Sequence, residues 1–311
     1  MLDSPGMGAP PITVATQARP IPINSWDELR VALDVYTAQS LAWAFRGLSS
    51  DQWLLRTSLE RLDAVPVYEA ERYLVSTFQR RAHHYISDPP QIDDELEWLA
   101  LMQHHGAPTR LLDWTKSPYV ALFFAVRDAT DPTGNSALWA IDLDWCKNQA
   151  LIQINRQPAF VAGTGGQPIQ PDDSLSKPEF FRKVFLNEPT TSAGFTLVAP
   201  LQPFRMNQRL VIQQGLFLCP GNIMLSFEQN LLAFASNLDF ANHVHKFQIP
   251  NSLRLDALAA LNKMNINQGT LFPGIDGFAQ SLGSNVEIAT KTGKLSTEIR
   301  KLNIYTEYGW L

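Results

Sequence analysis

Apolar residues along this chain recur with helical spacing in several segments of its first third. The first such segment begins after Ser25, where Ser25 and Glu28 have the spacing of a capping box. A second covers residues 68–85, and a third covers 93–106, acidic at its start and ending at Gly106, the residue type that most often follows a helix. The pattern therefore predicts three helices before residue 107.

Other segments have the alternation or the short apolar runs of β-strands. In residues 41–46 the side chains Leu41, Trp43 and Phe45 alternate with smaller or polar ones, so Arg46 is expected to point away from the face that carries Phe45. Further strands are predicted at 137–143, 196–201, 209–219 and 244–249. Later helices are predicted at 227–235, from a Ser252 cap to about residue 264, and within 270–282, where a turn leads into a short helix. This order predicts an α+β fold with a mixed or antiparallel curved sheet, either continuous or split, flanked by helices.

Polar chemistry is concentrated in residues 103–126, QHHGAPTRLLDWTKSPYVALFFAV. Ser117 followed by Pro118 is a strong helix start, and the apolar run after it predicts a buried helix. Free backbone N–H groups and the positive end of the helix dipole would then lie near Arg110, Thr115 and Ser117. Such an arrangement favours an anion or a phosphate.

Composition and charge narrow the function classes. The length of 311 residues is compatible with one elaborated domain or with two. A net charge of -5 argues against a broad nucleic-acid-binding face, and no apolar run approaches the roughly 18 residues of a membrane span. Residues 1–22 lack the features of a secretory signal, and Cys146 and Cys219 provide neither a disulfide framework nor a zinc site. We expect a cytoplasmic protein without a metal, and we interpret residues 163–178 as an insertion or a lid.

Four motifs in the same order resemble the FRG-domain family, named for a Phe-Arg-Gly triplet. They are AFRG at 44–47, QHHGAPTRLLDWTKSPYVALFFA at 103–125, QQGLF at 213–217 and LFPGIDG at 271–277. The resemblance implies an FRG domain over residues 23–285, preceded by a flexible tail at 1–22 and followed by an extension at 286–311. Because the family is met mainly in bacteria and their phages, the resemblance also implies a role in phage defense, in which the protein could act as a toxin.

A weaker similarity links the chain to ADP-ribosyltransferases. Arg46-Gly47 resembles their first motif, and Thr115-Lys116-Ser117 followed by ALFFA resembles their second. Their third motif carries a Glu on a strand, where this chain offers Gln213 and Gln214, which have no charge to stabilise a cationic transition state. The similarity implies an ADP-ribosyltransferase-like fold and NAD as the nucleotide, with ADP-ribosyl transfer or NAD cleavage as the reaction.

The two resemblances and the residue chemistry together define the candidate site. The candidate catalytic residues are Arg46, His104, His105, Gln213, Gln214 and Asp276. The candidate nucleotide-binding residues are Arg46, Gly47, Thr109, Arg110, Thr115, Ser117 and Tyr119. We expect Arg46, one of the two central histidines, Thr115 and one of the two glutamines to line a single cleft.

Each candidate also has a structural interpretation. Arg46 can pair with a carboxylate, either histidine can end a helix, and Ser117 can act only as a cap. Arg110 and Asp113 are expected to form an ion pair that locks their loop, and Asp276 suits a turn for backbone reasons. The alternative function is a non-catalytic ligand sensor or protein-interaction module, and a protein or nucleic-acid target for a transferase stays open. A two-metal nuclease is disfavoured, because the acidic residues at 93–95 and 172–173 fit a helix start and a loop.

Overall fold

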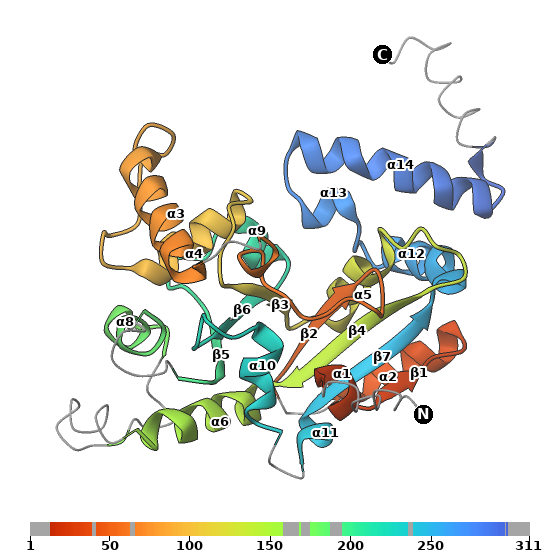
Figure 1. The fold of residues 1–311 in the computed structure, drawn as a ribbon. Coiled ribbons are helices and arrows are strands. Elements are labelled where there is room, and N and C mark those ends of the chain that lie inside the picture. The colour runs from red at the N-terminus through yellow and green to blue at the C-terminus, as the bar shows by residue number, and fades with distance from the viewer. Residues whose placement is uncertain are drawn as a thin grey trace, which may run out of the picture.

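One seven-stranded sheet organises the computed structural model, which describes residues 13–38, 42–62, 66–157, 168, 175–186, 195–235, 239–295 and 297 (Figure 1). Its strand order is β1-β7-β4-β2-β3-β6-β5. Among the strands of the described residues, β1 and β7 form the one parallel pair, so the sheet is mixed. The strands are β1 Pro20–Pro22, β2 Trp43–Leu48, β3 Leu112–Thr115, β4 Asn135–Asp142, β5 Val198–Leu201, β6 Gly215–Pro220 and β7 Val244–Pro250. The predicted α+β class with a mixed sheet is confirmed, and the sheet is continuous rather than split.

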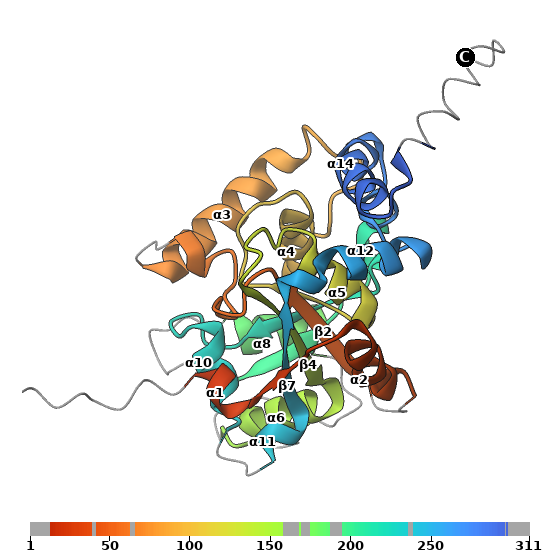
Figure 2. The same cartoon turned by 90° about the vertical axis from the view of Figure 1, so that its right-hand side faces the viewer.

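Helices cover both faces of this sheet and give the protein two apolar cores (Figure 2). One core receives side chains from α4 (Glu95–His104), α6 (Leu143–Asn155), α8 (Pro178–Phe185) and α10 (Phe227–Leu232). The other receives them from α2 (Trp26–Ala38), α5 (Pro118–Val126) and α12 (Arg254–Lys263). The remaining α-helices are α1 Val14–Gln17, α3 Val67–Ala82, α9 Gln208–Ile212, α11 Phe240–His243, α13 Gln268–Leu271 and α14 Ile275–Lys291. Within the described ranges, no helix is long and apolar enough to cross a bilayer.

Helix α5 packs directly on β2 because Gly47 has no side chain. A Cβ at Gly47 would lie 2.0 Å from the carbonyl oxygen of Ala121 and 2.4 Å from the amide nitrogen of Ala125. The helix begins as predicted, with Ser117 Oγ accepting a hydrogen bond from the N–H of Val120 at 3.3 Å and Pro118 in the first turn. The close approach of α5 therefore requires a residue without a side chain at position 47.

Three elements differ from the sequence prediction, one of them the short helix predicted within 270–282, which is α14 and extends over 17 residues to Lys291. The run 209–219 is not one strand, because Asn207 caps the short helix α9 through a hydrogen bond from Leu210 N to Asn207 Oδ1 of 2.9 Å. Gln214 then takes a left-handed conformation, φ 49°, and β6 starts only at Gly215. The Ser252 cap is also wrong: residues 251–253 form a 3₁₀ turn, and α12 starts after Leu253 without a side-chain cap.

The ends of the described chain are more structured than the predicted organisation implies. Val14, inside the segment interpreted as a tail, is fully buried in α1, and β1 pairs with β7. At the other end, α14 runs through residue 285, where the extension was expected to begin. The predicted lid at 163–178 lies mostly outside the described residues.

Candidate functional site

A cleft forms where β2 and β3 separate. Among the described residues these strands pair at a single position, Phe45 with Thr115, whereas β2 pairs with β4 along its whole length. Beyond that position the Arg46 side chain replaces the backbone pairing, and its Nη1 donates a hydrogen bond of 2.6 Å to the backbone carbonyl oxygen of Asp113. The divergence leaves a cleft of about 340 Å³ between β2, β3, α5 and α9.

Charged side chains dominate the polar lining of this cleft. They are the four arginines Arg46, Arg61, Arg127 and Arg209 and the two aspartates Asp113 and Asp128. Asp128 forms an ion pair with Arg127 Nε at 2.7 Å, and the Asp113 carboxylate accepts a hydrogen bond of 2.8 Å from Gln103 Nε2. Because cations outnumber carboxylates, the cleft attracts anions, and guanidinium groups match the geometry of phosphate oxygens.

The Arg46 guanidinium is only partly satisfied. Its Nε is buried and has no hydrogen-bond partner among the described residues. Burial lowers the pKa of Arg46 to about 10, an effect that the Asp113 carboxylate opposes and the Arg61 guanidinium reinforces. A buried N–H without an acceptor is costly in free energy, and because this Nε is inaccessible to solvent, the Arg46 side chain would have to shift before an anion could accept from it.

Arg127 and Arg209 are held by an aromatic ring between them. Their guanidinium carbons lie 5.4 Å and 4.6 Å from the centroid of Phe272. The Arg209 side chain makes no hydrogen bond or ion pair with the described residues. Burial lowers the pKa of Arg209, the Arg127 guanidinium lowers it further, and the Asp113 carboxylate opposes this shift. Stacking fixes the position of this guanidinium while its N–H groups stay available to a ligand.

Thr115 and Gln213 line the cleft as predicted, and both are engaged in holding its walls. Thr115 Oγ1 donates to the backbone carbonyl of Gln213 at 2.6 Å and accepts from the N–H of Ser117 at 3.0 Å. The Gln213 amide Nε2 donates to the carbonyl of Leu271 at 3.0 Å. These bonds join β3, α9 and α13 around the site.

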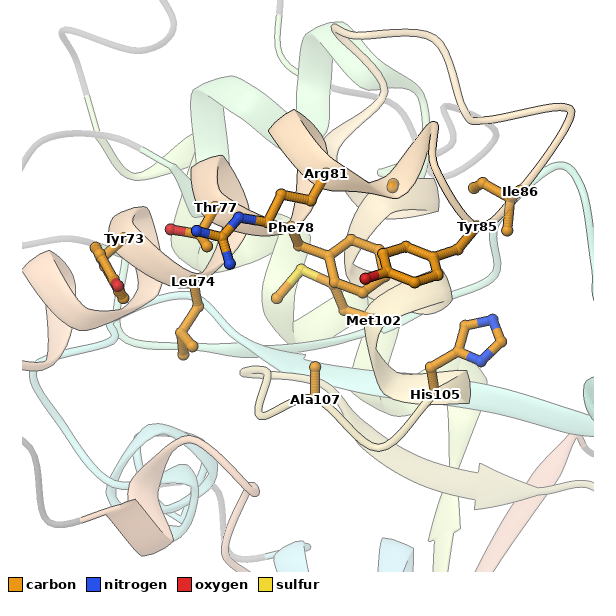
Figure 3. A pocket seen from close by; sticks show the side chains of 11 residues that line it. Tyr73, Leu74, Thr77, Phe78, Arg81, Tyr85, Ile86, Met102, His105 and Ala107 are labelled. Atoms are coloured by element: carbon orange, nitrogen blue, oxygen red, sulfur yellow. The ribbon is translucent and has the colours of Figure 1, made fainter.

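The two central histidines lie outside the cleft, so the expectation that one of them lines it with Arg46 is wrong. His105 borders an apolar cavity of about 510 Å³ between α3 and α4, together with Tyr85 and Met102 (Figure 3). His104, whose ring lies 4.8 Å from that of His105, borders a smaller hollow of about 280 Å³. This second hollow is lined by His104, Gln208, Arg209, Phe272, Pro273, Asp276, Gly277 and Gln280.

The predicted ion pair between Arg110 and Asp113 is also wrong. Arg110 is 1% exposed and forms a two-pronged pair with Glu71 of α3, with Nε 2.6 Å from Oε1 and Nη2 in contact with Oε2, while Nη1 donates to the carbonyl of Phe185. Burial alone would lower the pKa of Arg110, but the Glu71 carboxylate outweighs burial and raises it. Thr109 is equally buried and donates to Gln103 Oε1 at 2.6 Å. Both residues stabilise the loop behind the cleft.

The other predicted site residues take structural positions around the cleft. Gln214 is exposed and is not part of the cleft wall. Tyr119 donates from its hydroxyl to Asp34 at 3.0 Å and so ties α5 to α2. Ser117 caps α5, which uses N–H groups that the prediction had left for an anion. In the part of the chain that the structure describes, no group of three or more His, Cys, Asp or Glu side chains is arranged to hold a metal ion.

Sequence reasoning missed three arginines and one aromatic residue of the cleft. Arg209 stands four positions before Gln213 and so outside the recognised QQGLF motif, and Arg127 directly follows α5. Arg61 and Trp53 come from the segment after β2, and Trp53 is 57% exposed at the cleft. The available signal in the sequence was a tryptophan followed closely by Arg56 and Arg61, because aromatic residues near cations often contact planar ligands.

Comparison with known proteins gives one match. A family model described as the FRG domain matches residues 41–134, the part of the chain that contains β2, β3 and α5. No curated protein and no solved structure matches the chain. The match therefore includes the diverging strands and Arg46, Asp113 and Thr115.

Proposed function

We propose that this chain, which carries an FRG domain at residues 41–134, binds a nucleotide such as NAD in the arginine-lined cleft. The observation that carries the proposal is the excess of guanidinium groups over carboxylates in that cleft. Asp128 is already paired with Arg127, so Arg46, Arg61 and Arg209 face one remaining carboxylate, that of Asp113.

The chemistry of the lining fits the diphosphate of such a ligand. Arg209 has no hydrogen-bond partner within the described residues, so it can donate to phosphate oxygens without breaking an existing bond, while Arg46 adds positive charge at the cleft floor. Trp53 offers an exposed aromatic face at the same cleft for a base or a nicotinamide ring. Nucleotide binding is thus supported by positive charge that complements the diphosphate and by a flat apolar ring that suits a base.

The reaction that we propose is cleavage of the bond between nicotinamide and ribose, with transfer of the ADP-ribosyl group to an acceptor or to water. As this bond breaks, positive charge develops on the ribose, and a carboxylate close by stabilises that charge. Asp113 on β3 is the cleft carboxylate without an ion pair to Arg127, whereas the Gln213 amide is engaged with Leu271. We assign the electrostatic stabilisation of the ribose to Asp113. The biological setting that we propose is conflict between bacteria and phages.

A second candidate function is a non-catalytic nucleotide sensor. One observation favours it: the Asp113 carboxylate accepts a hydrogen bond from Gln103, and Asp128 is neutralised by Arg127, so each cleft carboxylate already has a protein partner. In a sensor the ligand would bind to the same arginines and leave unchanged.

Calorimetry with NAD and an assay for released nicotinamide separate these functions. We expect NAD to bind the wild-type protein, Arg209→Ala to weaken binding about tenfold or more, and Arg30→Ala, a surface arginine near Asp27 and Asp34, to leave it unchanged. Nicotinamide release that disappears in Asp113→Asn, with binding kept, supports the enzyme. Binding without release supports the sensor, and no binding of NAD or its halves by the wild-type protein refutes the proposal.

A further inference from the structure

The second hollow and the cleft share one side chain, that of Arg209. The cleft lies on one side of this guanidinium with Arg46 and Asp113, and the second hollow lies on the other side with His104 and Asp276. Arg209 makes no hydrogen bond or ion pair to its described surroundings, and its position is fixed by stacking on Phe272. It therefore stands at the junction of two hollows with its donors free.

Further contacts make the junction a cationic bridge. Arg127, a cleft residue, also stacks on Phe272 and donates from Nη1 to Gln268 Oε1 at 3.1 Å. Gln268 in turn donates from Nε2 to Oε1 of Gln280 at 2.7 Å, and Gln280 lines the second hollow. Two guanidinium groups on one aromatic ring, linked by hydrogen bonds to both hollows, suit a group with two negative charges.

The second hollow has a different chemistry from the cleft. Its polar side chains are a carboxylate, an imidazole and two amides, and Arg209 at its boundary is its cation. Asp276, in the first turn of α14, has no ion pair or hydrogen bond within the described residues. Burial, followed by the neighbouring His105 and Arg209, lowers the pKa of His104, so its imidazole is neutral at neutral pH. Such a set binds hydroxyl and amino groups rather than a second phosphate.

We propose that the two hollows hold the two arms of one dinucleotide. Its diphosphate contacts Arg127 and Arg209, one nucleoside occupies the cleft, and the other occupies the second hollow, where Asp276 accepts hydrogen bonds from its ribose hydroxyls and His104 contacts its base. The inference rests on the proposed nucleotide-binding function and specifies which class of nucleotide is bound.

Binding of NAD, AMP and NMN to purified protein tests this arrangement, because AMP and NMN are the two halves of NAD. We expect NAD to bind about tenfold or more tightly than either half. His104→Ala and Asp276→Asn should each weaken NAD about tenfold, and they should weaken only one of the two halves. His83→Ala, which alters a histidine at the end of α3 that lines neither hollow, is the matched control and should change none of the three affinities. Thermal melting of each variant confirms that it is folded.

The outcomes separate this inference from the proposed function. If the wild-type protein binds none of the three ligands, the nucleotide-binding function itself fails. If it binds NAD but both second-hollow variants bind NAD as the wild type does, the function stands and the two-hollow arrangement is overturned. Equal weakening of AMP and NMN in these variants would also overturn it, because a hollow that holds one arm cannot affect both halves alike.

Discussion

The guanidinium of Arg46 donates a hydrogen bond of 2.6 Å to the backbone carbonyl oxygen of Asp113, across the point where β2 and β3 part. A backbone ladder would normally continue there, and a side chain has taken its place. The consequence is that the floor of the cleft carries a charged group instead of paired peptide groups. Arg46 is thus part of the sheet and part of the binding surface at once.

Replacement of Arg46 by Met should impair binding more than folding. The change removes a charge-assisted hydrogen bond, typically worth about 1.5 to 3 kcal/mol, but it also removes a buried Nε without a partner, which costs about 1 to 3 kcal/mol in the wild type. These terms nearly cancel, so we expect the free energy of unfolding in urea to change by less than about 1 kcal/mol. NAD affinity should fall about tenfold or more. A loss of several kcal/mol in stability would instead identify Arg46 as mainly a scaffold residue.

The buried pair of Arg110 and Glu71 should be the larger contributor to stability. Removing either partner leaves an uncompensated buried charge, so Arg110→Met or Glu71→Leu should each lower the free energy of unfolding by about 3 to 5 kcal/mol. The double variant should recover most of this loss, because no charge is then left unpaired. Urea denaturation measures all three variants.

Asp113→Asn is the matched control for the two single variants and the double variant of Arg110 and Glu71. Its side chain is exposed and accepts a hydrogen bond from the neutral Gln103, so we expect the free energy of unfolding to fall by less than about 1 kcal/mol. Additive losses in the Arg110 and Glu71 double variant, with no recovery, would show that the two residues stabilise the fold independently.

Local signals in the sequence were sufficient for most elements. Ser117 with Pro118 specified the start of α5, and Ser25 specified that of α2, where the N–H of Glu28 donates to Ser25 Oγ at 3.1 Å. The capping box there is shifted by one residue, since the Glu28 carboxylate accepts from the N–H of Asn24 rather than of Ser25. Caps and apolar periodicity act within a few residues, which is why a single sequence reveals them.

The same local signals could not identify contacts between residues that are far apart in the sequence. Arg110 was paired with Asp113 because the two are three positions apart, whereas its actual partner Glu71 lies on α3, 39 positions earlier. The 209–219 run was apolar enough for a strand, and the cap that makes its first part helical is Asn207, which precedes the run. In the site, Arg46, Thr115 and Gln213 were correctly brought together from motifs, while Arg127 and Arg209 enter through their stacking on Phe272, a tertiary contact.

A methyl group at Gly47 should disrupt the contact between α5 and β2. The new Cβ of Gly47→Ala would overlap the α5 backbone at Ala121 and Ala125, and backbone atoms cannot move aside as a flexible side chain can. We expect the free energy of unfolding to fall by about 3 kcal/mol or more, and the yield of folded protein to be lower. Gly106→Ala is the control: φ there is 80° but no atom lies within 4 Å, so the cost should be about 1 to 2 kcal/mol. Similar melting temperatures for the two variants would contradict the close packing.

The pKa of His104 should report the charge of Arg209 between the two hollows. Burial, His105 and Arg209 lower that pKa in the folded protein, so the folded state binds this proton less well than the unfolded chain does. The free energy of unfolding is therefore unaffected at pH values well above the ordinary pKa of 6.5. It decreases as the pH falls through 6.5, until His104 is protonated in the folded state as well.

The variant Arg209→Ala removes one of the causes of the lowered pKa and should raise the pKa of His104. NAD should have the same effect if its diphosphate neutralises the Arg209 guanidinium. Titration of the imidazole signals by NMR measures this shift, with Arg30→Ala as a control that should leave it unchanged. An identical titration of His104 in wild type and Arg209→Ala would mean that the guanidinium exerts no field in the second hollow, and the proposed bridge between the hollows would lose its electrostatic basis.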